Sequence, residues 1–150
     1  MLRYRPATKQ DIRYVMKNLS EVSADEVETA GYTLSDATAL MLNAMRSGEA
    51  IAFLDRATPI AIMVFEPGVD GVTNTMFLAT QDFFGGRSRP TLFLKRFIDR
   101  RFEKNPELVL RSTTFSNHPK LIRWYEIIGG KLVGQDGAMS IFERTGCLSA

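Results

Sequence analysis

The sequence predicts a single α/β (α+β) domain in which helices cover a central, mixed and mostly antiparallel sheet. Strand-length runs of apolar or alternating residues recur along the chain, and segments with apolar residues at helical spacing separate them. Two of these runs are joined by a short turn, which favours an antiparallel hairpin. A length of 150 residues suits one domain with one core.

The composition excludes several classes of protein. A sequence that is 45% hydrophobic and 24% charged is ordinary for a globular protein, and a net charge of +2 is too small to indicate nucleic-acid binding. The single cysteine, Cys147, excludes an intramolecular disulfide and fits a reducing compartment. Because His118 is the only histidine, a Cys/His zinc site is also excluded, and we expect no metal. No apolar run reaches membrane length, and residues 1–11 lack a secretory core, so we expect a soluble, cytoplasmic protein.

The first elements are a strand and a capped helix. An alternating strand over residues 2–5 ends at Pro6. Thr8 and Asp11 then resemble a capping box, in which a hydroxyl and a carboxylate satisfy free N–H groups at the start of a helix. The buried face of this helix should carry the apolar residues at helical spacing: Ile12, Val15, Met16 and Leu19.

A second helix follows an acidic stretch. Residues 21–35 break the apolar pattern and leave room for one short helical turn, which Ser23 is placed to cap. The helix beyond them is the best defined in the chain, with Ser35 or Asp36 as its cap and Gly48 as its end. Its apolar face should consist of Ala37, Leu40, Met41, Ala44 and Met45.

Six further strands and two helices complete the expected order. The strands cover residues 49–55, 59–65, 73–82, 108–113, 130–133 and 138–143. A helix that begins at Pro90 lies between the third and fourth of these strands, and its apolar face carries Leu92, Leu94, Phe97, Ile98 and Phe102. A shorter helix between the fourth and fifth begins at Pro119, since proline suits the first helical turn, and the Gly129-Gly130 pair ends it. The predicted order is therefore strand, two helices, three strands, helix, strand, helix and two strands.

The segment from Ser112 to Gly130 resembles the acyl-CoA-binding end of the GNAT (GCN5-related) N-acetyltransferases. In that family the segment commonly reads N-x-x-A-x-x-[LF]-Y-E-K-x-G-F. Here residues 121–129, LIRWYEIIG, align with its second half without a gap. The junction RPATKQD, residues 5–11, also resembles the strand-to-helix junction that opens many members. The resemblance implies a GNAT-like, acyl-CoA-binding domain over residues 1–145 and transfer of an acetyl group from acetyl-CoA to an amine. Residues 146–150 are expected to form a flexible tail.

The resemblance implies a pyrophosphate-binding loop, typically Q/R-x-x-G-x-G/A, before the helix that starts at Pro90. Converging N–H groups and the helix dipole suit an anion there. In this chain Ser88 and Pro90 stand at the two small positions, and Pro90 has no N–H. Arg87 and Arg89 could compensate, because guanidinium groups suit phosphate oxygens. The alternative is a plain turn at Gly85-Gly86 with solvated arginines.

Tyr125 matches the family's tyrosine, which gives a proton to the CoA thiolate as it leaves. A phenol, whose ordinary pKa is about 10, suits that task. The alternative is an aromatic side chain that packs on the sheet. Trp124 is interpreted as a surface or substrate-side aromatic. The family's asparagine falls on His118 or on Asn117, and a histidine before proline is more often a helix cap than a base.

The remaining site residues are expected on two strand ends. In the family, the backbone of the strand before the pyrophosphate-binding loop holds the pantetheine arm. In this chain the corresponding residues are Leu78, Ala79 and Thr80. The general base for the amine would be Asp82 or Glu66, and each could equally be a solvated carboxylate.

The acceptor and the partners are the least determined. Carboxylates Asp25, Glu26, Glu28 and Asp136 would favour a cationic amine, either a small molecule or a protein lysine or N-terminus, unless they merely solvate a surface. Basic residues between 87 and 104 are interrupted by acids, so nucleic acid is not an expected partner. A homodimer is compatible with the resemblance. The alternative function is a non-catalytic GNAT-like binding or structural protein, because residues 117–132 also resemble GNAT-like proteins of tailed bacteriophages, some of them virion or host-takeover components.

Overall fold

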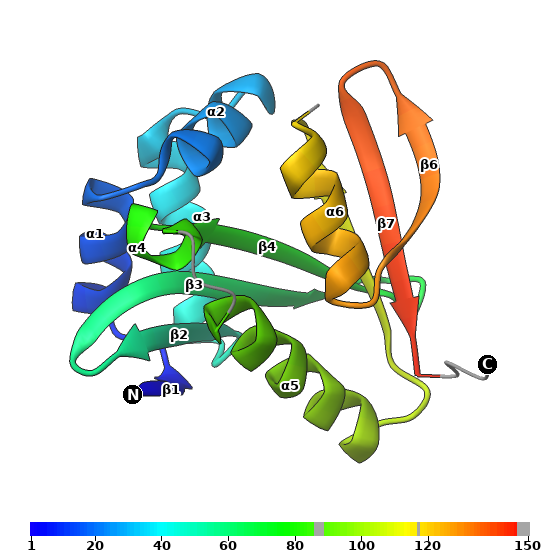
Figure 1. Ribbon diagram of the computed structural model, residues 1–150, viewed down its shortest axis with the longest axis horizontal. Coiled ribbons are helices and arrows are strands. Elements are labelled where there is room, and N and C mark those ends of the chain that lie inside the picture. Colours follow the sequence, from blue (N-terminus) through cyan, green and yellow to red (C-terminus); the bar gives the residue numbers. More distant parts are fainter. Residues whose placement is uncertain (86–88, 117, 147–150) are drawn as a thin grey trace. The chain divides into compact units, whose positions relative to one another are not determined.

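In the computed structural model, which describes residues 1–85, 89–116 and 118–146, strand β1 (Leu2–Pro6) leads into helix α1 (Lys9–Lys17) (Figure 1). The capping box predicted at its start is confirmed. Thr8 Oγ1 accepts a hydrogen bond from the Asp11 N–H (3.1 Å), and the Asp11 carboxylate accepts one from the Thr8 N–H (3.0 Å). The apolar stripe of α1 is buried, which anchors the helix on the sheet.

The acidic stretch contains a complete helix where the sequence predicted only a turn. Helix α2 (Glu21–Thr29) is capped by Ser20, whose Oγ accepts from the Ser23 N–H (3.2 Å), so the prediction of Ser23 as the cap is wrong. Helix α3 (Leu34–Arg46) begins two or three residues earlier than predicted, so neither Ser35 nor Asp36 is its cap. Its cap is Thr33, which forms a capping box with Asp36.

The chain forms a single-domain α+β fold with a mixed, seven-stranded sheet in the order β1-β2-β3-β4-β5-β7-β6. The pair β4–β5 is parallel, whereas β1–β2, β2–β3, β5–β7 and β6–β7 are antiparallel. The remaining strands are β2 (Ala50–Asp55), β3 (Thr58–Pro67), β4 (Thr73–Ala79), β5 (Val109–Thr114), β6 (Lys131–Asp136) and β7 (Met139–Thr145). The remaining helices are α4 (Gln81–Phe84), α5 (Arg89–Lys104) and α6 (Pro119–Ile127).

The predicted succession of strands is confirmed, with two differences among the helices. Helix α2 is longer than the predicted turn. The short helix α4 was not predicted, and it follows β4 so closely that the predicted strand 73–82 ends at Ala79. Two residues placed on apolar helix faces, Leu40 and Leu92, are 42% and 45% exposed, so they do not belong to the core.

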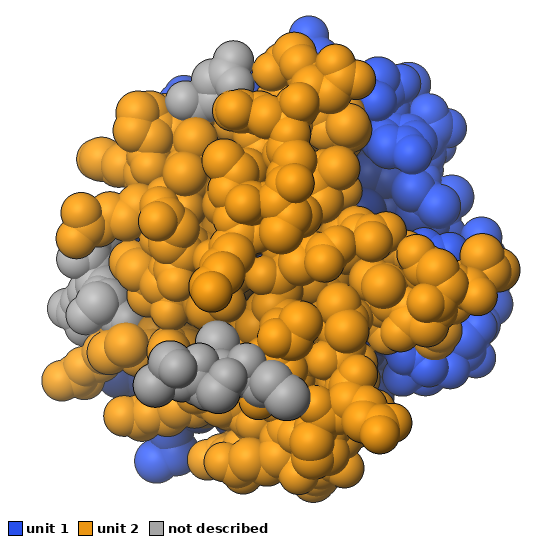
Figure 2. Space-filling view, turned by 90° about the vertical axis from the view of Figure 1, so that its right-hand side faces the viewer, with its two compact units in different colours: residues 1–66, 76–87 blue, residues 67–75, 88–150 orange. Residues whose placement is uncertain are grey.

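The chain divides into two compact units, which Figure 2 distinguishes by colour. Unit 1 comprises Met1–Glu66 and Met76–Arg87, and its core lies between α1–α3 and one face of its strands. On that face Ala52 of β2 pairs with Ile62 of β3, and both are completely buried. Residues 60–65 are all buried, as expected for a strand covered on both faces.

Unit 2 comprises Pro67–Thr75 and Ser88–Ala150, and a buried arginine on β7 connects its helices. Arg144 is 7% exposed; it pairs with Asp99 of α5 and donates to the Ile128 carbonyl at the end of α6 (2.9 Å). Its guanidinium also lies over the Phe102 ring, 4.6 Å from the centroid. Gly129 lies against this arginine with φ +98°, and a Cβ there would come within 2.9 Å of Arg144 Cδ. The glycine predicted to end α6 is therefore required by both conformation and space.

Within the described part of the chain, no helix has the length and hydrophobicity that a membrane span requires. Among those same residues, no three His, Cys, Asp or Glu side chains are grouped so as to hold a metal ion. Cys147 and most of the tail predicted over 146–150 lie outside the described residues.

Candidate active site

The first turn of α5 carries one of the predicted phosphate ligands. Arg89 is the first residue of the helix and is exposed, whereas Pro90 is buried. The first N–H groups of a helix have no partner within it, so this end attracts anions even though Pro90 contributes no donor. Arg87 and Ser88, the other residues predicted for the loop, lie outside the described residues.

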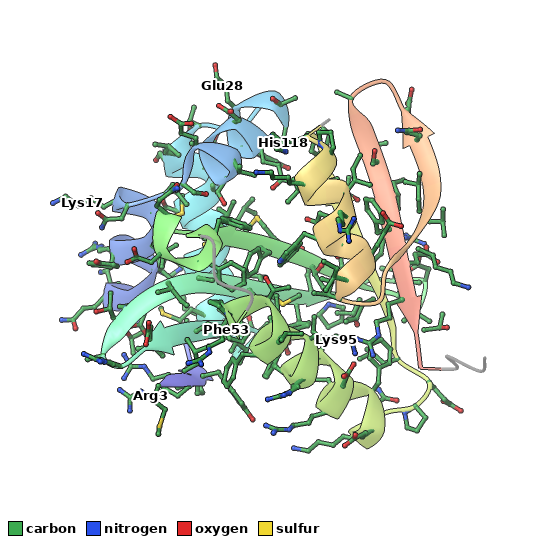
Figure 3. The ribbon with its side chains drawn as sticks, in the orientation of Figure 1. Arg3, Lys17, Glu28, Phe53, Lys95 and His118 are labelled. Carbon is green, nitrogen blue, oxygen red and sulfur yellow. The ribbon has the colours of Figure 1, made fainter. Side chains whose placement is uncertain are left out.

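Hydrogen bonds between residues two positions apart order the segment that leads into α6. The Ser116 N–H donates to Thr114 Oγ1 (3.3 Å), and the His118 N–H donates to Ser116 Oγ (3.2 Å). The Lys120 N–H then donates to His118 Nδ1 (3.2 Å), so the histidine caps α6 (Figure 3). The interpretation of His118 as a helix cap is confirmed. Asn117 lies outside the described residues.

Tyr125 lies in the last full turn of α6 and is 6% exposed. Its ring stacks on Phe142 of β7, with centroids 4.9 Å apart and planes 12° apart. It also meets the edge of Trp124 at 5.0 Å. The ring is thus held by packing, which agrees with the packing interpretation and leaves the proton-donor role as a prediction.

Trp124 is a buried structural link, so its interpretation as a surface aromatic is wrong, and the substrate-side alternative stays a prediction. It is 6% exposed, and its indole N–H donates to Thr91 Oγ1 in the first turn of α5 (3.2 Å). Helical spacing from Leu121 places Trp124 on the buried side, so the sequence contained a signal for its burial. Nothing in the local sequence indicated Thr91 as its partner.

The end of β4 is the predicted pantetheine site, and part of its backbone already has partners in unit 1. The Ala79 N–H donates to Ser23 Oγ (3.0 Å), and the Ala79 carbonyl accepts from the Ser20 N–H (2.9 Å). The Thr80 N–H donates to the Ile60 carbonyl of β3 (2.9 Å). Ser20 and Ser23 at the start of α2 therefore occupy one edge of β4, an arrangement that the sequence did not predict.

The two candidate bases, Asp82 and Glu66, do not lie at the same end of unit 1. Asp82 is exposed in the first turn of α4, two residues after Thr80. Thr80 is hydrogen-bonded to Ile60, and Glu66 is six residues further along β3, which corresponds to about 20 Å of strand. The two carboxylates are therefore alternatives and cannot serve one reacting amine together.

No protein-family model and no curated protein matches the sequence. Solved structures do match it over nearly its whole length. The PaiA N-acetyltransferase of Thermoplasma acidophilum in complex with coenzyme A has a TM-score of 0.73 and 14% identity, covering 97% of this chain and 99% of that one. A GNAT-family acetyltransferase of Bacillus anthracis has a TM-score of 0.72 and 12% identity over 97% and 95% of the two chains.

The aminoglycoside acetyltransferase AAC(6')-Ib in complex with ribostamycin and coenzyme A is similar to the same extent. Its TM-score is 0.70 at 18% identity, covering 96% of this chain and 93% of that one. The predicted fold is thus confirmed: the chain has the fold of the GNAT acetyltransferases.

Proposed function

We propose that this chain is an acyl-CoA-dependent N-acyltransferase that moves an acetyl group from acetyl-CoA to an amine. The observation that carries the proposal is the likeness, over nearly the whole chain, to acetyltransferases solved with coenzyme A. Residues 1–145 would form the acyl-CoA-binding domain. Acetyl-CoA would act as a co-substrate, and its pyrophosphate would bind at the first turn of α5, where Arg89 is exposed.

The chain's own residues would move two protons in this reaction. The amine nitrogen bonds to the thioester carbon as the carbon–sulfur bond breaks. The Tyr125 phenol gives its proton to the departing sulfur, and Asp82 takes a proton from the amine, directly or through water. We prefer Asp82 to Glu66 because Asp82 precedes the proposed phosphate loop by only a few residues. Leu78, Ala79 and Thr80 would contact the pantetheine arm through their backbone.

The second candidate function is a non-catalytic GNAT-like protein. One observation favours it: both backbone polar groups of Ala79 are bonded to Ser20 and Ser23. A pantetheine arm that used the Ala79 groups would have to displace them. Pro90 adds to this, because it removes one N–H from the first turn of α5.

Coenzyme A binding separates the two candidate functions. A ligand at a hundredfold excess over its dissociation constant stabilises the folded state by about 2.7 kcal/mol. For a chain of this length, that corresponds to a rise of roughly 5–10 °C in melting temperature. Isothermal calorimetry and thermal melts with CoA should show both effects. Absence of heat and of a thermal shift at millimolar CoA would favour the non-catalytic protein.

Arg89 provides a sharper version of the same experiment. Arg89→Ala should weaken CoA binding about tenfold, because a hydrogen bond to a charged group is lost. The melting temperature without CoA should not change, since the side chain is exposed. The matched control is Arg100→Ala, exposed on the same helix about 16 Å further along. Equal effects of both variants would indicate general electrostatic attraction instead of a site.

The acceptor is expected to be cationic. Exposed carboxylates Glu21, Asp25 and Glu28 follow one another at helical spacing on α2 (Glu28 is labelled in Figure 3), and Asp136 is exposed at the end of β6. A fixed negative charge of this kind attracts cationic amines. Ribostamycin, an aminoglycoside, is bound in one of the structures with this fold.

Salt dependence tests this expectation. Cationic acceptors should lose apparent affinity as salt rises, because exposed charges are screened over about 8 Å at physiological ionic strength. The double variant Asp25→Asn, Glu28→Gln should raise the KM of a polyamine severalfold. The control, Glu103→Gln with Glu107→Gln, removes the same charge from exposed positions outside α2. Preference for neutral amines, or rates indifferent to salt, would contradict selection by these carboxylates.

A further inference from the structure

The sole tryptophan connects the two helices on which the proposed reaction depends. Trp124 belongs to α6 and directly precedes Tyr125. Its indole N–H donates to Thr91 Oγ1 (3.2 Å), in the first turn of α5 and two residues after Arg89. Both helices belong to unit 2, so the bond lies within one compact part of the chain.

Two further contacts among the described residues hold α6 against β7 instead of α5. At its C-terminal end, the Ile128 carbonyl accepts from Arg144 (2.9 Å), and the Tyr125 ring stacks on Phe142. Both of these contacts seat α6 on β7. The bond from Trp124 instead fixes α6 against the start of α5, with the indole ring packed at 80° to the Tyr125 ring.

We propose that Trp124 and Thr91 form a positioning pair that sets Tyr125 relative to the first turn of α5. The inference rests on the proposed function, in which that turn anchors the pyrophosphate and Tyr125 protonates the leaving sulfur at the other end of the arm. Proton transfer needs heavy atoms within about 2.6–3.2 Å. A displacement of about 1 Å can cost a hundredfold in rate. The hydrogen bond from Trp124 to Thr91 joins the helix that would anchor the pyrophosphate, α5, to the helix that carries Tyr125, α6, and so limits this displacement.

Thr91 offers a nearly isosteric test. Thr91→Val removes the acceptor oxygen and keeps the side-chain volume, so kcat for acetyl transfer should fall about tenfold. The dissociation constant of CoA should stay within about twofold, since the phosphate donors remain. Thr91→Ser restores the hydroxyl and should recover most of the turnover. Thr113→Val, an exposed threonine on β5, is the matched control and should behave like the wild type.

A double-mutant cycle assigns the effect to the bond itself. Trp124→Phe removes the N–H donor, and combining it with Thr91→Val should cost no more than Trp124→Phe alone, because the two side chains act as a pair. Additive losses, an unchanged kcat in Thr91→Val, or a loss confined to CoA affinity would overturn the positioning role. A wild type that binds no CoA and transfers no acetyl group would instead overturn the proposed function, and the positioning role with it.

Discussion

Tyr125→Phe is expected to lower turnover by roughly ten- to ten-thousandfold, the range that general acid catalysis contributes. The substitution removes the hydroxyl and keeps the ring that stacks on Phe142 at 4.9 Å. Both the CoA dissociation constant and the melting temperature should therefore stay close to those of the wild type. Steady-state kinetics with acetyl-CoA and a reactive amine, together with calorimetry and thermal melts, measure the three quantities.

The control for this prediction is Tyr14→Phe. Tyr14 lies on α1, and 42% of it is exposed, so loss of its hydroxyl should change neither rate nor stability. If Tyr125→Phe lowers the melting temperature and leaves acetyl transfer intact, the Tyr125 hydroxyl is structural. The buried setting of Tyr125 makes the comparison necessary, because a buried phenol is commonly kept for its hydrogen bond alone.

The parts of the fold that were predicted correctly depend on patterns that are local in the sequence. The capping box at Thr8 involves residues three positions apart, and Gly129, which ends α6, lies only two residues after the last helical residue. Helix α2 was underestimated because few of its side chains are buried and its surface is acidic. One of its stabilising contacts, from the Ala79 N–H to Ser23 Oγ, joins residues 56 positions apart. No local pattern indicates such a bond.

In the candidate site, too, only the features that are local in the sequence were predicted. The position of Tyr125 and the capping role of His118 follow from the short segment around them. The partner of Trp124 lies 33 positions earlier, and that of Arg144 lies 45 positions earlier. An arginine near the end of a strand is usually expected to face solvent. In β7, however, Phe142 is buried, and the alternation of the strand places Arg144 on the same buried side.

The Arg144–Asp99 pair should make the largest single contribution to stability among the ion pairs of unit 2. Arg144 has 8% of its side chain exposed, so removing Asp99 leaves a buried charge without its counterion. Breaking a buried pair costs about 3–5 kcal/mol, and the lower end applies because the Asp99 side chain is 32% exposed. Asp99→Asn should therefore lower the melting temperature by roughly 6–12 °C.

Lys95→Gln is the matched control, because Lys95 pairs with the same carboxylate at 3.1 Å and has 39% of its side chain exposed (Figure 3). An exposed pair contributes less than about 1 kcal/mol, so this variant should melt within a few degrees of the wild type. A loss in Asp99→Asn no greater than that in Lys95→Gln would show that the buried pair does not stabilise unit 2.

The pH dependence of stability gives an independent measure of the same pair. Burial by itself would raise the pKa of Asp99, but hydrogen bonds from Arg144 and Lys95 outweigh burial and lower the pKa below its usual value of 3.8. A carboxyl with a lowered pKa in the folded state stabilises that state above its unfolded pKa, and this contribution is lost as the pH falls through the folded pKa. The wild type should therefore lose stability as the pH is lowered from about 5 to 2.

Asp99→Asn should lose less over that range, because its amide does not titrate. One source of the stability that this variant still loses at low pH lies in unit 1. The pKa of Asp11 is also lowered, since hydrogen bonds from Arg5 and Thr8 outweigh its burial. Denaturant melts at pH 7, 5, 4 and 3 would compare the wild type, Asp99→Asn and Asp11→Asn. Parallel pH profiles for the wild type and Asp99→Asn would mean that the Asp99 carboxylate is not held ionised by Arg144.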